Sequence, residues 1–239
     1  MKRNSNLSLR ILEATSAARA VGFNKVAITA FFELLSSVVN KHKLTPERIY
    51  DCDETEISCV PKSKGRIISV KGRRQVGALT SAKRGQTVTV EVYFNAASTY
   101  LLPMFVYLRL RMKQELLNGA APGTWAECHS SGWMQGNIFI SWFKRFVKLS
   151  RASKERPVLL LLDGHSTHTK NIELIDMLET MTLYYCFPPH CTHRLQPLDV
   201  AFMKPLSTYY DQEVTKWLRC NPGWVVGVFQ IAELWKCFS

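Results

Sequence analysis

The sequence predicts an α/β fold, in which three antiparallel strands are followed by parallel strands and helices flank the mixed sheet. Apolar residues alternate with polar ones from Thr87 to Phe94, the period of a half-buried strand. Residues 158–162 are an unbroken apolar run ended by Asp163 and Gly164, as in a strand buried on both faces. A helical pattern and another strand pattern follow, which is the order of a parallel crossover. The 239 residues are enough to bury one large core of this kind.

The first half of the chain supplies one helix and three strands. Residues 1–24 are polar and irregular, and we interpret them as a lead-in or linker remnant that carries no chemistry. Apolar residues at helical spacing predict a helix over 25–41, where the domain proper (25–218) begins. Strands are expected over 48–53, 87–94 and 101–108, and they favour an antiparallel meander.

The second half supplies the helices that cover the sheet and the parallel strands. A stretch rich in Pro, Gly and Ser predicts a loop over 119–132, and one apolar stripe predicts a helix over 139–147. Residues 219–239 are interpreted as a truncated C-terminal tail. Three elements follow the apolar strand: a helix over 172–178, a strand over 183–187 and a helix over 203–218.

The chain is strongly basic, with 31 Lys+Arg against 19 Asp+Glu and a net charge of +12. The interval from Pro61 to Arg84 contains many of these cations, no acidic residue and several glycines, so we expect turns that present cations outward. A segment that cannot neutralise itself favours phosphate contact, and the alternative is a solvated loop. The predicted DNA-binding residues are Lys62, Lys64, Arg66, Lys71, Arg73, Arg74, Lys83 and Arg84.

Membrane and secreted classes are not favoured. The longest apolar runs span only a few residues, far short of the ~20 that a membrane helix needs. No apolar segment follows the first residues, and the 7 cysteines lack a framework spacing, so we expect reduced thiols.

Three aspartates stand next to predicted elements. Asp53 and Asp163 come where strands are expected to end, and Asp199 precedes the last helix. Carboxylates suit hard divalent cations, and two such ions ~4 Å apart can stabilise both oxygens that change bonds in a phosphodiester. Each aspartate could instead be a turn or cap residue. Asp51 and Glu54 are expected to point away from Asp53.

Three sequence blocks carry a family resemblance: Ile49–Thr55 (IYDCDET), Leu159–His168 (LLLLDGHSTH) and Phe187–Val200 (FPPHCTHRLQPLDV). In this order they resemble the DDE superfamily endonuclease domain of pogo/Tigger-like transposases, which is related to the jerky and centromere protein B proteins. The resemblance implies a ribonuclease H-like fold. It also implies that Asp53, Asp163 and Asp199 are catalytic and bind two Mg²⁺ or Mn²⁺ ions.

The resemblance further implies that the partner is DNA and that the reaction is cleavage and strand transfer at transposon ends. It also implies a nuclear location and is compatible with a homodimer. His165, His168 and His193 are candidates for orienting water or phosphate around the aspartates, or for capping the helices that follow. One departure from the family pattern is Glu56, where the family usually has glycine. Another is that the helix-turn-helix domains that precede the catalytic domain in the family have no counterpart here.

Three alternatives stay open from the sequence. The protein could be a domesticated nucleic-acid-binding protein that has lost catalysis, or an unrelated α/β phosphohydrolase that uses two of the aspartates. Cys186, His190, Cys191 and His193 are close enough in sequence to bind zinc, although their spacing is not that of a standard finger.

Overall fold

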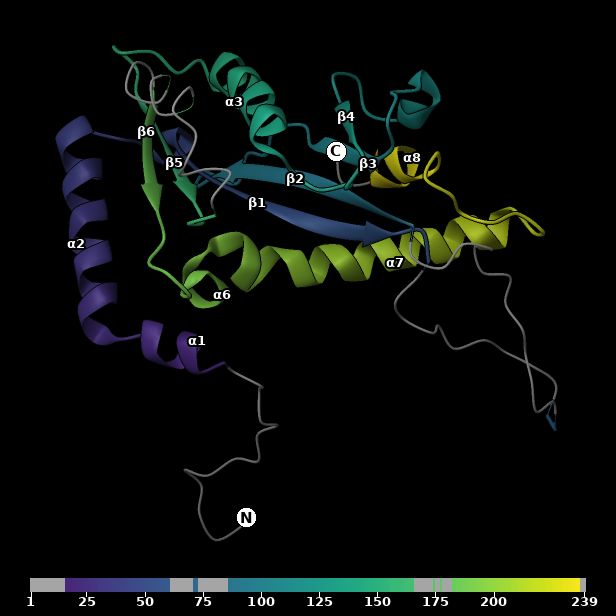
Figure 1. The fold of residues 1–239 in the computed structure, drawn as a ribbon, viewed down its shortest axis with the longest axis horizontal. Coiled ribbons are helices and arrows are strands. Elements are labelled where there is room, and N and C mark those ends of the chain that lie inside the picture. The colour runs from purple at the N-terminus through teal and green to yellow at the C-terminus, as the bar shows by residue number, and fades with distance from the viewer. Residues whose placement is uncertain are drawn as a thin grey trace, which may run out of the picture.

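One mixed sheet of six strands, in the order β4-β3-β2-β1-β5-β6, organises the protein (Figure 1). The structure is a computed structural model that describes residues 16–60, 71–72, 86–165, 174, 177 and 182–236. The pairs β1–β2 and β2–β3 are antiparallel, whereas β1–β5, β5–β6 and β3–β4 are parallel. The predicted α/β fold and its antiparallel meander are therefore confirmed. The strands are β1 (Ile49–Ser58), β2 (Thr87–Asn95), β3 (Met104–Leu108), β4 (Trp125–His129), β5 (Val158–Leu162) and β6 (Thr182–Cys186).

Strand β1 is longer than predicted, because it continues past Asp53 to Ser58. Its antiparallel register with β2 runs unbroken from Tyr50↔Asn95 to Ser58↔Thr87, so ladder hydrogen bonds extend the strand. The parallel pairing with β5 stops earlier, at Asp51↔Leu161. The expectation that the strand ends at Asp53 is wrong, but Asp53 does lie where β1 loses its parallel neighbour.

The predicted loop over 119–132 contains the short edge strand β4, so the loop prediction is wrong for Trp125–His129. Trp125–His129 pair in parallel with Met104–Leu108 of β3. Gly119, Gly123 and Gly132 have positive φ and turn the chain on either side of the strand, and these glycines gave the stretch its loop-like composition. Strand β3 itself begins after Pro103, whose nitrogen has no hydrogen to donate to a ladder.

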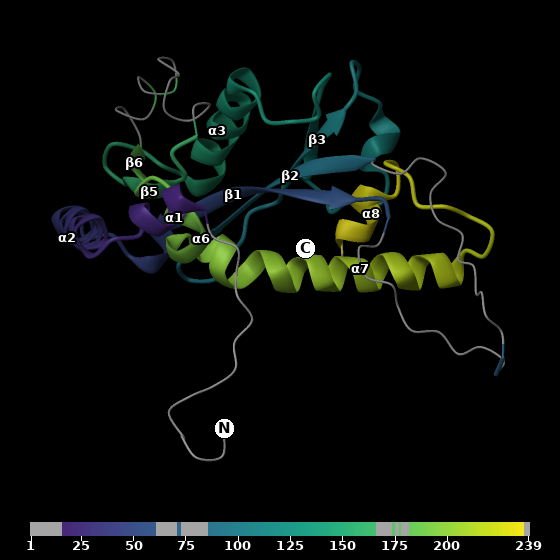
Figure 2. The ribbon, with the colours of Figure 1, turned by 60° about the horizontal axis from the view of Figure 1, so that its bottom comes forward.

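Helices cover both faces of the sheet (Figure 2). On one face α3 (Gly136–Ser150) packs its aromatic stripe against Tyr50, Cys52 and Tyr93. On the other face lie α7 (Met203–Cys220) and α8 (Ile231–Trp235). Because neighbouring residues of a strand point to opposite faces, Tyr93 belongs to the first core and Val92 to the second.

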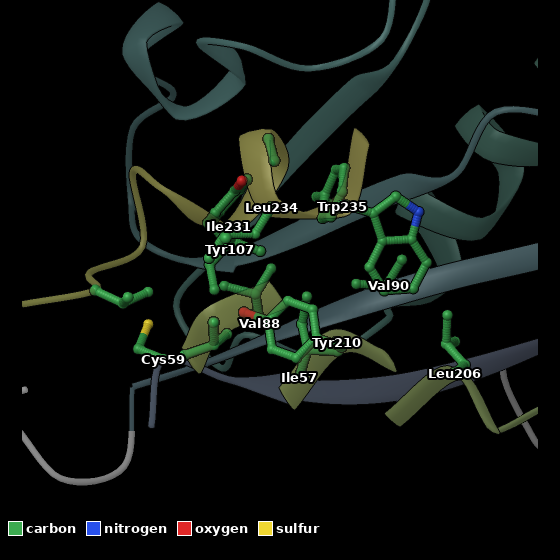
Figure 3. Packing of buried hydrophobic residues seen from close by; sticks show 14 of the residues in the cluster. Ile57, Cys59, Val88, Val90, Tyr107, Leu206, Tyr210, Ile231, Leu234 and Trp235 are labelled. Carbon is green, nitrogen blue, oxygen red and sulfur yellow. The ribbon is translucent and has the colours of Figure 1, made fainter. Parts of the chain in front are cut away.

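The segment interpreted as a truncated tail contributes to the second core. Ile231, Leu234 and Trp235 of α8 are buried against β3, and Figure 3 shows Trp235 and Leu234 beside Tyr107 and Val90. The Trp235 ring contacts the Phe105 ring edge-on, with ring centroids 5.9 Å apart. Residues up to Trp235 are therefore part of the packed domain.

Helix α2 (Lys25–His42) packs against strands β5 and β6, and it confirms the helix predicted over 25–41. Phe31 stacks on Tyr185 and Phe187, with ring centroids 4.8 Å and 5.4 Å apart. A short helix, α1 (Ala17–Gly22), precedes it, so the irregular lead-in prediction is wrong there. The helix predicted over 172–178 lies outside the described residues apart from Leu174 and Met177. The remaining short elements are η1 (Pro46–Arg48), η2 (Gln114–Leu117), α6 (Thr192–Leu195) and η3 (Leu198–Phe202).

Candidate active site

Asp53 and Asp163 lie beside each other on neighbouring parallel strands. Asp53 is inside β1, and Asp163 is the first residue after β5. The last paired residues are Asp51 and Leu161, so the same register continued by two residues sets Asp53 opposite Asp163. Asp163 Oδ1 accepts a hydrogen bond of 3.1 Å from the backbone N–H of His165, which turns the chain at the strand end.

Asp199 reaches the same place from a distant part of the sequence. It lies in η3, a π-helical turn between α6 and α7, and its carboxyl group shares a hydrogen bond with that of Asp53. Burial and then the charge of Asp199 raise the pKa of Asp53 to about 8, with smaller contributions from Asp51 and Asp163. Burial also raises the pKa of Asp199, and Asp163 adds to that rise. The structure thus brings the three predicted acids together.

This donor set has the chemistry that a hard divalent cation prefers. Carboxylates gathered in a partly dehydrated place repel one another, and a cation between them removes that penalty. Within the described residues, however, no group of three His, Cys, Asp or Glu side chains already surrounds one ion position. An ion shared by all three therefore requires their carboxylates to move closer together. The catalytic and metal-binding roles of these aspartates stay predictions.

Two basic side chains act on Asp199. His193 and Arg19 both lower its pKa and so oppose the effect of burial. Of the three histidines predicted to surround the aspartates, His193 is therefore near the cluster. The side chain of His165 is exposed just past β5, and His168 lies outside the described residues.

Helix α1 brings Arg19 to this position, which the interpretation of residues 1–24 did not foresee. The helix docks on the segment before α6, because the Cys191 thiol donates a hydrogen bond of 3.3 Å to the carbonyl of Gly22. The Arg194 guanidinium lies over the Phe23 ring, 4.8 Å from its centroid. The serine before the helix, Ser16, accepts a hydrogen bond from the backbone N–H of Arg19 and caps it.

The expectation that Asp51 points away from Asp53 is wrong. Residues two apart on a strand share a face, so Asp51 and Asp53 point the same way, whereas Glu54 is on the opposite face. Burial raises the pKa of Asp51 to about 7, and hydrogen bonds from Leu198 and Gln196 oppose that rise. Strand alternation places Asp51 on the face of Asp53, but it does not reveal the tertiary hydrogen bonds that Asp51 makes with Gln196 and Leu198.

The predicted DNA-binding residues fall largely outside the described part of the chain. Of the eight, the structure describes Lys71, which is exposed. Strand β1, which precedes them in the sequence, ends at Ser58, five residues past Asp53 or about 17 Å along an extended strand. Glu56 lies in the extended backbone of β1 opposite Thr89, a conformation that accepts a side chain without strain.

The zinc alternative gains no support from the described residues. The Cys191 thiol is buried and donates to the backbone carbonyls of Gly22 and Pro189. It acts as a packing group that anchors α1. No three-donor group of metal ligands is present around it in the described part of the chain.

Comparisons with known proteins identify the family and the fold. The family model described as "DDE superfamily endonuclease" matches residues 85–222, more than half of the chain. A curated protein of Cochliobolus lunatus, described as "MFS-type transporter clz9", is 28% identical over 179 residues, which are 73% of this chain and 19% of that protein. Among the described residues, no helix has the length and apolar character to cross a membrane.

Three similar solved structures are complexes of the Mos1 transposase. The Mos1 transposase paired-end complex with left transposon end has a TM-score of 0.52 at 14% identity, covering 98% of this chain and 66% of that one. The Mos1 strand transfer complex has a TM-score of 0.52 at 15% identity, with 98% and 65% covered. The Mos1 mariner paired-end complex with Mn has 0.51 at 14%, with 97% and 64% covered.

These matches confirm the predicted ribonuclease H-like fold, because the six-stranded sheet and its flanking helices superpose over nearly the whole chain. The chain spans about two thirds of the length of these structural relatives and about a fifth of the curated relative.

Proposed function

The chain belongs to the DDE superfamily endonuclease family, and from this premise we propose that it cleaves and transfers DNA phosphodiester bonds with the help of two divalent metal ions. The observation that carries the proposal is the approach of three carboxyl groups from separate parts of the sequence. Asp199 shares a hydrogen bond with Asp53, and Asp163 is close enough to raise the pKa of both. A cluster of like charges of this kind is unfavourable for folding and suits a cation.

Asp53, Asp163 and Asp199 would hold the ions. Mg²⁺ or Mn²⁺ bound there would lower the pKa of the attacking water or 3′-hydroxyl and stabilise charge on the leaving oxygen. Near neutral pH the raised pKa of Asp53 keeps a proton on the Asp53–Asp199 pair. The carboxylates must release this proton to act as ligands, so cation affinity should increase with pH.

DNA as the substrate is supported by charge and by the structural relatives. The net charge of +12 favours a polyanion, and Arg19 and His193 lie near Asp199, where a phosphate would approach. The similar structures of Mos1 hold a transposon end or are strand transfer complexes. A chromosomal DNA substrate would place the protein in the nucleus.

The test is nicking of supercoiled plasmid DNA by the full chain in MnCl₂. We expect nicked and linear products that EDTA prevents and that disappear when Asp163→Ala, purified in parallel, replaces the wild type. The parallel purification separates the protein's own activity from that of a contaminating nuclease.

Binding of DNA without nicking by either protein would contradict the proposal and favour the non-catalytic nucleic-acid-binding alternative. Hydrolysis of small phosphoesters without DNA affinity would favour an unrelated phosphohydrolase.

A further inference from the structure

A buried polar network ties β1 to the segment that carries Asp199. Asp51 is 4% exposed and Gln196 is 1% exposed, although each has a strongly polar side chain. Gln196 Nε2 donates to Asp51 Oδ1 at 3.2 Å and to the carbonyl of Cys52 at 2.9 Å. The backbone N–H of Leu198 donates to Asp51 Oδ2 at 3.0 Å.

Only one orientation of the Gln196 side-chain amide satisfies this network. Both carboxylate oxygens of Asp51 are used, and Nε2 of Gln196 makes both of its bonds, while Gln196 Oε1 is buried with no partner among the described residues. A flipped amide would set Oε1 against two acceptors, the Asp51 carboxylate and the Cys52 carbonyl, and would lose both hydrogen bonds. Buried polar groups are costly unless paired, so the network favours one placement of the segment on β1.

This placement sets the position of Asp199. Leu198, which donates to Asp51, directly precedes Asp199, and Pro197 between Gln196 and Leu198 has a φ of −57° set by its ring. The backbone N–H of Val200 donates to the carbonyl of Gln196 at 3.0 Å, so the turn around Asp199 is closed on both sides. On the β1 side, Asp51 is two residues before Asp53 and on the same face.

The network therefore works against the repulsion between the carboxylates. Asp53 and Asp199 would separate if η3 could move away from β1, and the hydrogen bonds from Gln196 and Leu198 to Asp51 oppose this movement. Both carboxylate oxygens of Asp51 already accept hydrogen bonds, so the structure gives Asp51 a supporting contact with this segment.

We propose that Asp51 is a positioning residue, which with Gln196 holds Asp199 at the separation from Asp53 that the divalent ions need. This inference rests on the proposed function, since it concerns the same cluster. It adds two residues that touch neither the substrate nor the ions.

The experiment compares the full-length wild type with Asp51→Asn, Gln196→Met and Tyr107→Phe. Asp51→Asn removes one acceptor and a charge, whereas Gln196→Met removes the two side-chain hydrogen bonds and leaves every charge in place. Tyr107→Phe is the matched control, because it removes one buried hydrogen bond, to the carbonyl of Leu116 at 2.9 Å, on the distant strand β3. Two readouts decide the inference: the Mn²⁺ dissociation constant by calorimetry, and deuterium exchange of the amides of residues 196–202. Plasmid nicking at low and high MnCl₂ and the urea midpoint of unfolding are measured beside them.

We expect both network variants to weaken Mn²⁺ binding about tenfold or more, the usual effect of losing a residue that orients a ligand. Amide exchange over 196–202 should accelerate at least about tenfold in both, and high MnCl₂ should restore nicking. Tyr107→Phe should lower the urea midpoint of unfolding and change neither readout.

Unchanged Mn²⁺ affinity in Gln196→Met and Asp51→Asn, with the same loss of stability as Tyr107→Phe, would show a purely structural network and overturn the inference. Failure of the wild type to bind Mn²⁺ would instead overturn the proposed function. In that case, deuterium exchange of the network variants would still test whether the network positions Asp199. Acceleration confined to residues 196–202 would support this positioning, and unchanged exchange would refute it.

Discussion

Asp53→Asn is expected to abolish metal-dependent nicking and, at the same time, to make the metal-free protein more stable. Loss of a metal ligand should reduce the nicking rate by at least about 10³-fold, more than the 10- to 100-fold that loss of an orienting residue costs. Stability should rise because the amide cannot carry the charge that burial and Asp199 make unfavourable. An inactive but more stable variant would indicate that Asp53 serves the activity of the site at a cost in the stability of the fold.

The gain in stability should depend on pH. Burial raises the pKa of Asp53 from its ordinary value of 3.8 to about 8 in the folded protein, so the folded state binds more protons than the unfolded state between these values. The free energy of unfolding of the wild type should therefore fall as pH rises from about 4 to about 8, by at most about 1.4 kcal/mol per pH unit for this group. Asparagine removes the contribution of Asp53, while that of Asp51, whose pKa burial raises to about 7, remains.

Thermal unfolding in EDTA at pH 5 and pH 8 measures this difference. Glu33→Gln, which removes one exposed carboxylate on α2, controls for the change in net charge and should leave nicking and the pH profile as in the wild type. With saturating MnCl₂ the order should reverse, because only the wild type gains stability from ion binding. An Asp53→Asn protein that still nicks DNA would exclude Asp53 as a ligand.

Trp142→Ala is expected to cause the largest loss of stability. Trp142 is fully buried in α3, stacked on Phe146 at 5.5 Å between ring centroids and edge-on to Tyr93 at 5.3 Å. Removing a buried tryptophan leaves a cavity that costs roughly 3–5 kcal/mol, a large part of the ~5–15 kcal/mol by which a domain is stable. Urea unfolding followed by circular dichroism should show a midpoint well below that of the wild type.

Trp133→Ala is the matched control, because Trp133 is 52% exposed. It should change the free energy of unfolding by about 0.5 kcal/mol or less. Equal midpoints for Trp142→Ala and the wild type would mean that α3 does not form the core described on this face of the sheet.

The strands with strong patterns were predictable from the sequence, and the weak edge elements were not. The apolar run of β5 and the alternating pattern of β2 directly predict that these strands are buried. Strand β4 lies at the sheet edge with every residue half-buried, so no alternation marks it, and the glycines around it suggest a loop. Helix α1 has six residues and is stabilised by tertiary contacts with the Cys191 segment, which local propensity does not report.

The three aspartates were predictable because sequence motifs point to them, but the residues that hold them in place were not. Asp51 and Gln196 are 145 positions apart, and their hydrogen bond depends on a tertiary contact that no local pattern encodes. Arg19 likewise reaches Asp199 only through the docking of α1. The contacts that hold the three aspartates in place could therefore not be predicted from the sequence, because they form only when distant segments pack.

The most direct test of the central claim is anomalous diffraction at the manganese edge from crystals of the full chain grown with MnCl₂. We predict manganese peaks bound by the carboxylates of Asp53, Asp163 and Asp199. Manganese bound only elsewhere on the surface, with Asp53 and Asp199 still sharing their proton, would contradict the account.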